Sequence, residues 1–224
     1  MFTFCPPIEL PDLKSETLTE GRFYTTPDGD KLPSVTTVIG AQKKKSILEW
    51  RQRVGEEKAN AISAKSSRRG TNVHTLCERF LSNEPLGNIM PDALEMFRTI
   101  VPHLKRINNI HYLECALWSL KLQMAGRVDC IGEFDGVLSV IDFKTSKRIK
   151  SEEDIPEYFA QCAAYALMYE ELVGIPINQI VVIMAVEDEE PIVFVKKTKN
   201  HINSLVKYIR YYRHFHTQKR LTGT

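Results

Sequence analysis

The sequence lacks long hydrophobic runs, paired cysteines and a large excess of charge of either sign. Its longest apolar runs, such as residues 180–186, have the length of a strand, well short of the roughly 18 apolar residues that a membrane-spanning helix needs. The first twenty residues hold one basic residue, Lys14, and four acids, a pattern unlike a secretory signal or an Arg-rich presequence. We therefore expect a protein without a membrane partner, in the cytoplasm of a bacterium or of a phage-infected cell.

Cysteine is sparse and scattered. The chain has five cysteines, at positions 5, 77, 115, 130 and 162, and no CxxC pair. An odd number of widely spaced cysteines is not typical of a disulfide framework or of a zinc site. We expect reduced thiols that are buried or incidental.

The composition is that of an ordinary globular protein, but the charge is placed unevenly. The 224 residues are 43% hydrophobic and 26% charged, and 30 Lys and Arg against 28 Asp and Glu give a net charge of +2. Residues 41–70 hold nine basic residues and three acids, and residues 196–224 hold eight basic residues and no acid. These segments could follow a nucleic-acid backbone, with the aromatic residues of 208–215 stacking on bases. Alternatively, those aromatic side chains form a core face and the cations are solvated.

Hydrophobic periodicity and turn residues predict an α/β fold. Residues 1–21 are predicted to be an irregular lead-in. A small hairpin follows, formed by residues 22–26 and 32–39 on either side of the Pro27-Asp-Gly-Asp turn. The predicted order is then helices 46–64, 70–81 and 91–107, strands 111–120, 123–133 and 137–144, helix 155–173, strands 179–186 and 192–196, and helix 199–216. This order predicts one domain, residues 22–224, with a central mixed β-sheet flanked by helices and a helical N-terminal portion.

Asp135-Gly136 is the strongest hairpin signal in the chain, because it separates two apolar runs. A loop of these two residues places Asp129 directly opposite Asp142. Directly opposed side chains have Cβ atoms roughly 4.5 to 5.5 Å apart, and like charges at that distance repel. Two such carboxylates favour a cation between them.

The second strand of this hairpin carries an acid and a base on the same face. Alternation directs Asp142 and Lys144 to one side and Ile141 and Phe143 to the other, which packs into the core. Divalent cations such as Mg²⁺ are commonly held by one or two carboxylates, and a nearby lysine can orient water or neutralise a phosphate. The spacing thus predicts a metal site that acts on phosphate.

A third acid and an alternative interpretation follow from the same strands. Glu114 lies opposite Asp129 if the preceding strands connect at residues 121–122. The alternative to a metal site is a solvated ladder in which the two aspartates pair with Arg127 and Lys144, a surface arrangement of small energetic value.

Four short motifs follow one another along the chain: Arg69-Gly-Thr-Asn-Val-His74, Gly126-Arg-Val-Asp129, Ile141-Asp-Phe-Lys144-Thr-Ser and Gln161-Cys-Ala-Ala-Tyr165. In this order they resemble the motifs of the RecB-type branch of the PD-(D/E)xK nucleases, most of all the group formed by the mitochondrial genome maintenance exonucleases and their phage relatives. Upstream, Leu32-Pro-Ser-Val-Thr and Leu48-Glu-Trp50 also resemble that group. The similarity covers roughly residues 22–200.

The resemblance implies a restriction-endonuclease-like core with a metal-dependent active site. Asp129, Asp142 and Lys144 would be catalytic, and both aspartates would bind Mg²⁺ or Mn²⁺. His74 would be a further metal ligand donated by a helix, and Glu114 is a candidate for an additional metal ligand.

Other residues of the motifs would contact the substrate. Gln161 and Tyr165 are four residues apart on one helix and therefore share a face, from which they would position a DNA strand. Arg69, Ser34 and Trp50 are further candidates for substrate binding.

The function implied by the resemblance is that of an exonuclease. We expect a monomer that hydrolyses phosphodiester bonds at single-stranded DNA ends or flaps during DNA replication, repair or recombination. Alternatives are a relative that resects duplex ends or cuts internally, a Cas4-like nuclease without an iron-sulfur cluster, and a non-catalytic DNA-binding member of the fold. The Cas4-like and AddB-like nucleases that carry an iron-sulfur cluster hold it with one cysteine upstream of the core and three near the C-terminus. No cysteine follows Cys162 in this sequence, so the resemblance implies no iron-sulfur cluster.

Overall fold

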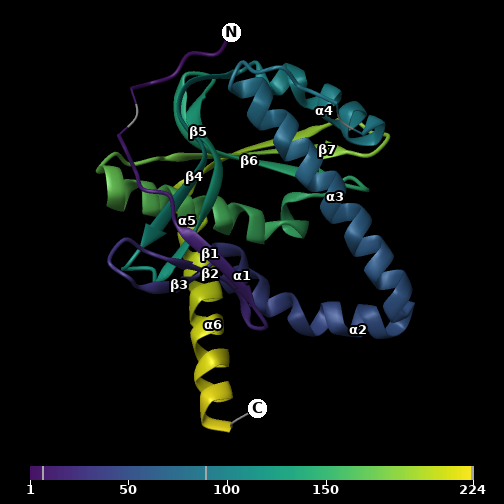
Figure 1. Cartoon of the computed structure of the whole chain (residues 1–224), viewed down its shortest axis with the longest axis vertical. Helices are drawn as coiled ribbons and strands as arrows, with labels where there is room; N and C mark the ends of the chain where they lie inside the picture. The colour runs from purple at the N-terminus through teal and green to yellow at the C-terminus, as the bar shows by residue number, and fades with distance from the viewer. Residues whose placement is uncertain (7, 89, 223–224) are drawn as a thin grey trace.

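A five-stranded mixed sheet forms the centre of the molecule in the computed structural model, which describes residues 1–6, 8–88 and 90–222 (Figure 1). The strands lie in the order β4-β5-β6-β7-β8, and only β6 and β7 pair in parallel. Their bounds are β4 Ile107–Ser119, β5 Met124–Phe134, β6 Val137–Ser146, β7 Gln179–Val186 and β8 Ile192–Lys197. The predicted mixed sheet is confirmed, and β7 has the predicted bounds.

Helices cover both faces of this sheet, and each face has its own apolar core. On one face α3 (Glu56–Leu81) and α4 (Pro91–Leu104) pack against side chains that include Ile141 and Phe143. On the other face α1 (Val35–Gly40), α5 (Pro156–Val173) and α6 (Ile202–Thr222) pack against side chains that include Val140. Neighbouring residues of β6 thus enter opposite cores, as the alternation predicts. Helix α5 supplies the crossover that the parallel pair requires.

The N-terminal segment forms a second, small sheet, which corrects the prediction of an irregular lead-in. Strands β1 (Lys14–Leu18), β2 (Gly21–Thr25) and β3 (Lys31–Pro33) are antiparallel, so the predicted hairpin is confirmed. All five residues of β1 are exposed, which leaves no apolar alternation in the sequence to indicate a strand. Residues 35–39, predicted as part of the second hairpin arm, belong to α1 (Val35–Gly40) instead, because the Ser34 side chain caps that helix.

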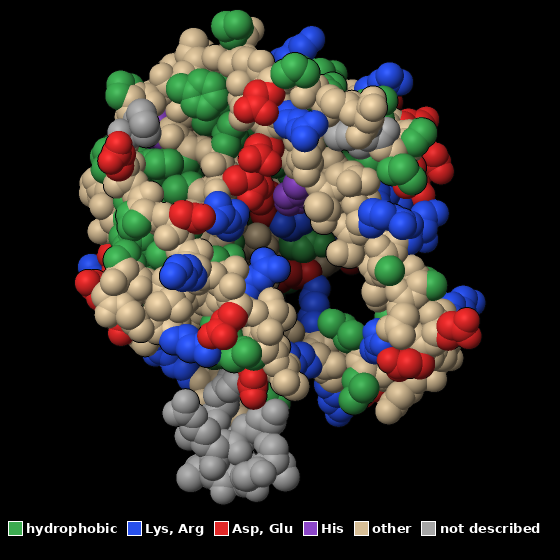
Figure 2. All heavy atoms as spheres, in the orientation of Figure 1, with side chains coloured by type: hydrophobic (Ala, Val, Ile, Leu, Met, Phe, Trp, Pro, Cys, Tyr) green, Lys and Arg blue, Asp and Glu red, His purple; other side chains and the backbone are tan. Residues whose placement is uncertain are grey.

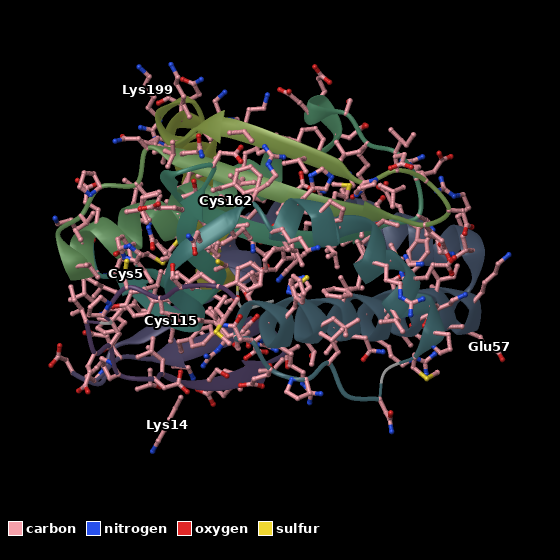
Figure 3. All side chains as sticks on the ribbon, turned by 90° about the horizontal axis from the view of Figure 1, so that it is seen from above. Cys5, Lys14, Glu57, Cys115, Cys162 and Lys199 are labelled. Atoms are coloured by element: carbon pink, nitrogen blue, oxygen red, sulfur yellow. The ribbon has the colours of Figure 1, made fainter. Side chains whose placement is uncertain are left out.

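Helices α2 (Lys44–Val54) and α3 project from the core as a bent arm (Figure 1). The break between them lies at Gly55, whose φ of 87° suits glycine. The predicted break near residues 65–69 is wrong, since α3 runs through it. No residue of α2 is buried, and Glu57 lies at the far corner of the arm (Figure 3).

Short 3₁₀ turns join several elements, namely η1 (Ala41–Lys43), η2 (Glu152–Asp154) and η3 (Thr198–Asn200). The cysteines are all free thiols, and Cys5, Cys115 and Cys162 lie apart from one another (Figure 3). Among the described helices, none is both long and apolar enough to cross a membrane.

The C-terminal helix resolves the two interpretations of its aromatic residues. Tyr212 is buried and Tyr208 packs partly on the core. Tyr211 and Phe215 are 41% and 39% exposed, with nearly parallel rings 6.5 Å apart. Two aromatic residues therefore belong to the core and two are accessible. Residues 223–224 of the predicted basic tail lie outside the described residues.

Candidate active site

A cavity of about 690 Å³ lies where α3 and α5 meet the strands β4, β5 and β6, with the small N-terminal sheet on one side. The cavity collects most of the predicted site residues. These are His74, Glu114, Asp129, Lys144, Gln161, Tyr165 and Ser34.

The strand register that brings the acids together is the predicted one. In β5 and β6 the pairs run from Phe134 opposite Val137 to Cys130 opposite Ile141, so the loop is Asp135-Gly136. Both loop residues have positive φ, 52° and 78°, as a type I′ hairpin turn requires.

The preceding hairpin also has the register that the sequence predicts, although its turn is longer. The strands pair up to Ser119 opposite Met124, which leaves a four-residue turn around residues 121–122. Leu113 pairs with Cys130 and Cys115 with Val128, so Glu114 lies opposite Asp129. Its φ of 47° marks a local distortion of β4 at this position.

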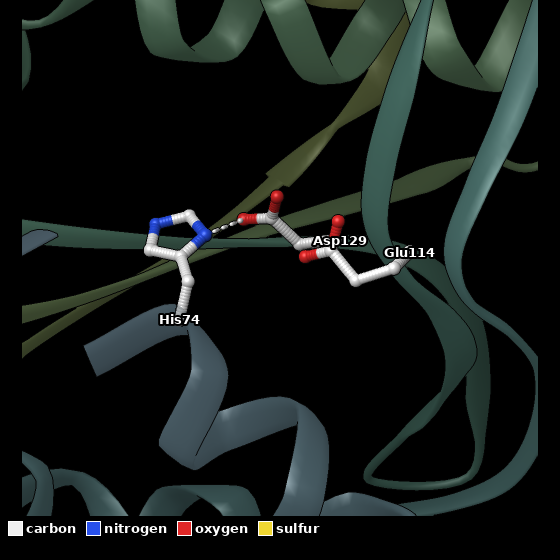
Figure 4. A group of neighbouring side chains, drawn as sticks. All are labelled: His74, Glu114 and Asp129. Atoms are coloured by element: carbon white, nitrogen blue, oxygen red, sulfur yellow. Dashed lines mark ion pairs between the residues drawn. The ribbon is translucent and has the colours of Figure 1, made fainter. Parts of the chain in front are cut away.

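His74, Glu114 and Asp129 all line the cavity and lie next to one another (Figure 4). Each residue offers a ligand atom, and these atoms all lie within 4.8 Å of one another. His74 comes from α3 and its Nδ1 is 3.4 Å from Oδ2 of Asp129. A helix and two strands thus converge on one point.

Asp129 is held as a carboxylate. Burial alone would raise its pKa, but the charge of His74 and a hydrogen bond with that ring, together with Lys144, lower it below its usual value. The backbone N–H of Phe143 donates to Oδ2 at 2.8 Å. In turn, burial lowers the pKa of His74, but Asp129 outweighs burial and raises it.

Burial and the nearby carboxylate of Asp129 raise the pKa values of both Glu114 and Asp142. Burial, then repulsion from Asp129, raises the pKa of Glu114 to about 7. Burial also raises the pKa of Asp142 to about 6, although Lys144 opposes that rise. Carboxyl groups perturbed in this way are typical of functional sites.

Asp142 lies outside the three-residue cluster. Its Oδ1 accepts hydrogen bonds from Lys144 Nζ at 2.6 Å and from Gln161 Nε2 at 3.0 Å. Burial alone would lower the pKa of Lys144, but the charges of Asp142 and Asp129 outweigh burial and raise it. The ammonium therefore stays charged. The ammonium lies 5.1 Å from the ring centroid of Tyr158. The role of Asp142 as a metal ligand therefore remains a prediction.

Gly126 allows Tyr165 to line the cavity. A Cβ atom at Gly126 would come within 2.7 Å of the Tyr165 hydroxyl and 3.0 Å of its Cε1. The Tyr165 side chain is buried and belongs to the apolar core, so it has little room to withdraw. This close approach explains why glycine begins the motif that ends at Asp129.

Of three further predicted substrate contacts, Arg69 and Trp50 lie outside the active-site cavity, and Ser34 lies within it. Arg69 is buried against Glu187 and lines a different cavity. The face of α3 that borders the active-site cavity carries Gly70, Thr71 and His74 instead. Trp50 lies on α2 and does not line the active-site cavity. Ser34 does line it, but its hydroxyl caps α1 by accepting from the Thr37 N–H at 3.0 Å.

The cavity also contains residues that sequence reasoning missed. Tyr158 contacts Lys144 and also accepts a hydrogen bond from Lys150. Arg22 and Tyr24 reach the cavity from β2. Arg127 also lines the cavity, although the sequence suggests only that it pairs with an acid. It lies two residues before Asp129 on the same strand face, and this spacing could have indicated its place in the cavity. No pattern in the sequence indicates the contribution of β2.

A deep opening lies between the arm formed by α2 and α3 and the rest of the molecule (Figure 2). Lys and Arg side chains edge this opening, and acidic and histidine side chains lie just above it. Some of the basic residues of 41–70 are engaged with acids, for example Lys43 with Glu157 and Arg51 with Glu56.

The donor set fits a divalent cation. Carboxylate oxygens suit Mg²⁺ and Mn²⁺, and an imidazole nitrogen suits transition metals such as Mn²⁺. The raised pKa of Glu114 beside ionised Asp129 is a further fit, since a bound cation would relieve that repulsion.

A mixed sheet with an acid-lined cavity and a lysine two residues after a buried aspartate defines a class of nucleases. The model of the PD-(D/E)XK nuclease superfamily matches residues 92–211, more than half of the chain. The chain belongs to this superfamily.

Individual relatives agree with this assignment. Mitochondrial genome maintenance exonuclease 1 of Homo sapiens is 32% identical over 130 residues, which are 53% of this chain and 38% of that protein. The protein of the same name from Xenopus tropicalis is 29% identical over 173 residues, 71% of this chain and 50% of that protein. The chain thus spans half or less of the length of these relatives.

A solved structure assigned as an exonuclease, from Eubacterium rectale, covers 64% of this chain and 63% of its own. Its TM-score is 0.47 at 14% identity.

Proposed function

We propose that the protein is a divalent-metal-dependent exonuclease that degrades DNA from single-stranded ends or flaps, as a single nuclease domain of residues 22–224. The observation that carries the proposal is the placement of Lys144 and the cluster of His74, Glu114 and Asp129 in one cavity. Relatives named exonucleases support the mode of action. A place in DNA replication, repair or recombination follows from the same similarity.

His74, Glu114 and Asp129 would hold the cation, Mg²⁺ or Mn²⁺. Asp142 would be a further metal ligand and a catalytic residue, as the family resemblance implies. Such an ion supplies charge neutralisation at the scissile phosphate and lowers the pKa of water. Asp129 is suited to this task because its pKa is lowered and its carboxylate is fixed by the Phe143 N–H.

Lys144 would bind an oxygen of the scissile phosphate. Its pKa is raised, so it carries a full charge at neutral pH, and Asp142 and the Tyr158 ring fix its position. A cation held in a water-poor cavity stabilises charge that develops on phosphate without first having to reorient. Gln161 shares the Asp142 carboxylate and completes this support.

The preference for single strands rests on the arm of α2 and α3. The opening beneath it is edged by cations (Figure 2), and an unpaired strand is thinner and more flexible than a duplex. A strand that must pass through an opening needs a free end.

The proposal is tested by comparing linear single-stranded, linear duplex and circular single-stranded DNA, each with Mg²⁺, Mn²⁺ or EDTA. We expect fast metal-dependent loss of the linear single strand, slow loss of blunt duplex and no cleavage of the circle. Equal degradation of duplex would favour a resecting enzyme, and cleavage of the circle would favour internal cutting. Activity in EDTA would refute the metal requirement.

A further inference from the structure

A second cavity, of about 470 Å³, lies on the far side of α3 from the candidate active site. Its walls are the N-terminal half of α4 and the turn between β7 and β8, and Arg69 of α3 contributes to its lining. No part of the proposed nuclease mechanism uses it.

This cavity is strongly acidic. It has one arginine and six carboxylate side chains, Asp92, Glu95, Glu187, Asp188, Glu189 and Glu190. A wall of that charge repels a nucleic-acid backbone and attracts cationic groups. Among the described residues, the one group of three or more acids and histidines close enough to share a metal ion is His74, Glu114 and Asp129, so the six acids do not form such a group.

Arg69 gives the cavity a second chemical requirement. The side chain is only 4% exposed, and its Nη1 lies 2.8 Å from the Glu187 carboxylate. Its Nε is buried and has no hydrogen-bond acceptor. A buried donor without an acceptor costs roughly 1 to 3 kcal/mol. A ligand that brings an oxygen acceptor would remove this cost.

We propose that this cavity binds a Lys- and Arg-rich segment of a partner protein, whose side chains meet the six acids while a backbone carbonyl accepts from Arg69. A basic peptide combines both groups, since its cations are separated by peptide carbonyls. Arg69 directly precedes Gly70 and Thr71, which line the active-site cavity, so the docked segment would lie one helix away from the nuclease centre.

The test uses the full chain and a fluorescein-labelled, C-terminally amidated octapeptide of lysine and arginine with interspersed glycine. Fluorescence anisotropy should show saturable binding that weakens with salt. The double variant E189K/E190K should bind about tenfold or more weakly, equivalent to 1.4 kcal/mol, and keep its nuclease activity. The matched control E57K/E84K changes charge equally at two exposed sites outside the cavity and should bind like the unmodified protein.

Two results would overturn the proposal. One is equal binding by E189K/E190K and the unmodified chain, or equal weakening by the control. The other is recognition of charge alone, without the peptide carbonyl. Spermine carries comparable charge without a carbonyl, so we expect it to compete much more weakly than unlabelled peptide. Equal competition by spermine, or equally tight binding by a folded R69Q variant, would show that the cavity recognises charge alone and would overturn the proposal.

Discussion

Glu114→Gln should stabilise the metal-free protein at alkaline pH and not at acidic pH. The pKa of Glu114 is raised by folding to about 7, because burial and Asp129 both disfavour its charge. The folded state therefore holds this proton more tightly than the unfolded chain. Stability contributed by the proton is present below the unfolded pKa of about 4.5 and is lost as the pH rises towards 7.

The magnitude follows from the same values. A change in pKa from 4.5 to about 7 corresponds to about 3 kcal/mol in a fully buried site. Glu114 is partly exposed, so solvent screening reduces this to about 1 to 2 kcal/mol. In a domain of this size that is a rise in Tm of about 2 to 8 °C for the glutamine variant at pH 8.

The assay is thermal unfolding in EDTA at pH 5 and pH 8, with Glu84→Gln, an exposed acid outside the cavity, as the control. Adding Mn²⁺ at pH 8 should reverse the order, because the unmodified cluster gains more from the cation. The reasoning is refuted if Glu114→Gln has the same Tm as the unmodified protein at pH 8 in EDTA, or if the control gains as much.

Three further changes test the architecture of the site. Gly126→Ala forces a Cβ against Tyr165 and should cost about 1 to 3 kcal/mol in urea unfolding; an unchanged urea midpoint would show that the ring yields freely. Ser34→Ala removes the cap of α1 and should cost about 1 kcal/mol, measured in the same way, and no loss would assign the cap no energetic role. Tyr158→Leu removes the ring beside Lys144 and should lower kcat of the nuclease more than it raises KM, whereas a change in KM alone would make Tyr158 a substrate contact.

The part of the site that lies on the central hairpins could be predicted from the sequence. Asp135-Gly136 permits few loop conformations, and period-two alternation then determines which side chains share a face. That is why the register of β5 and β6 and the common face of Asp142 and Lys144 are present in the structure. The opposition of Glu114 and Asp129 has the predicted register, but it depends on the longer turn of the preceding hairpin. Local rules are sufficient where neighbouring strands are also neighbours in sequence.

The parts that the sequence did not predict depend on distant segments. Strand β1 is exposed on both faces, so it has no hydrophobic signature, and the contribution of β2 to the cavity depends on how two sheets pack. Arg69 belongs to a motif but does not line the active-site cavity. The face of α3 that packs toward this cavity determines which motif residues reach it, and the motif alone does not specify that face. Asp142 contacts Lys144 rather than joining the acids, a choice of side-chain orientation that spacing does not determine.

We propose that Lys144 and the cluster around Asp129 perform metal-dependent hydrolysis of DNA ends. The most direct measurement is the single-turnover rate of label release from an end-labelled single strand in Mg²⁺, for the unmodified protein, Lys144→Met and Asp129→Asn, with circular dichroism to verify folding. We expect each variant to be folded and slower by at least about 10²-fold, the loss typical of removing one preorganised charge-stabilising group. A folded variant with full activity at either position would contradict the account.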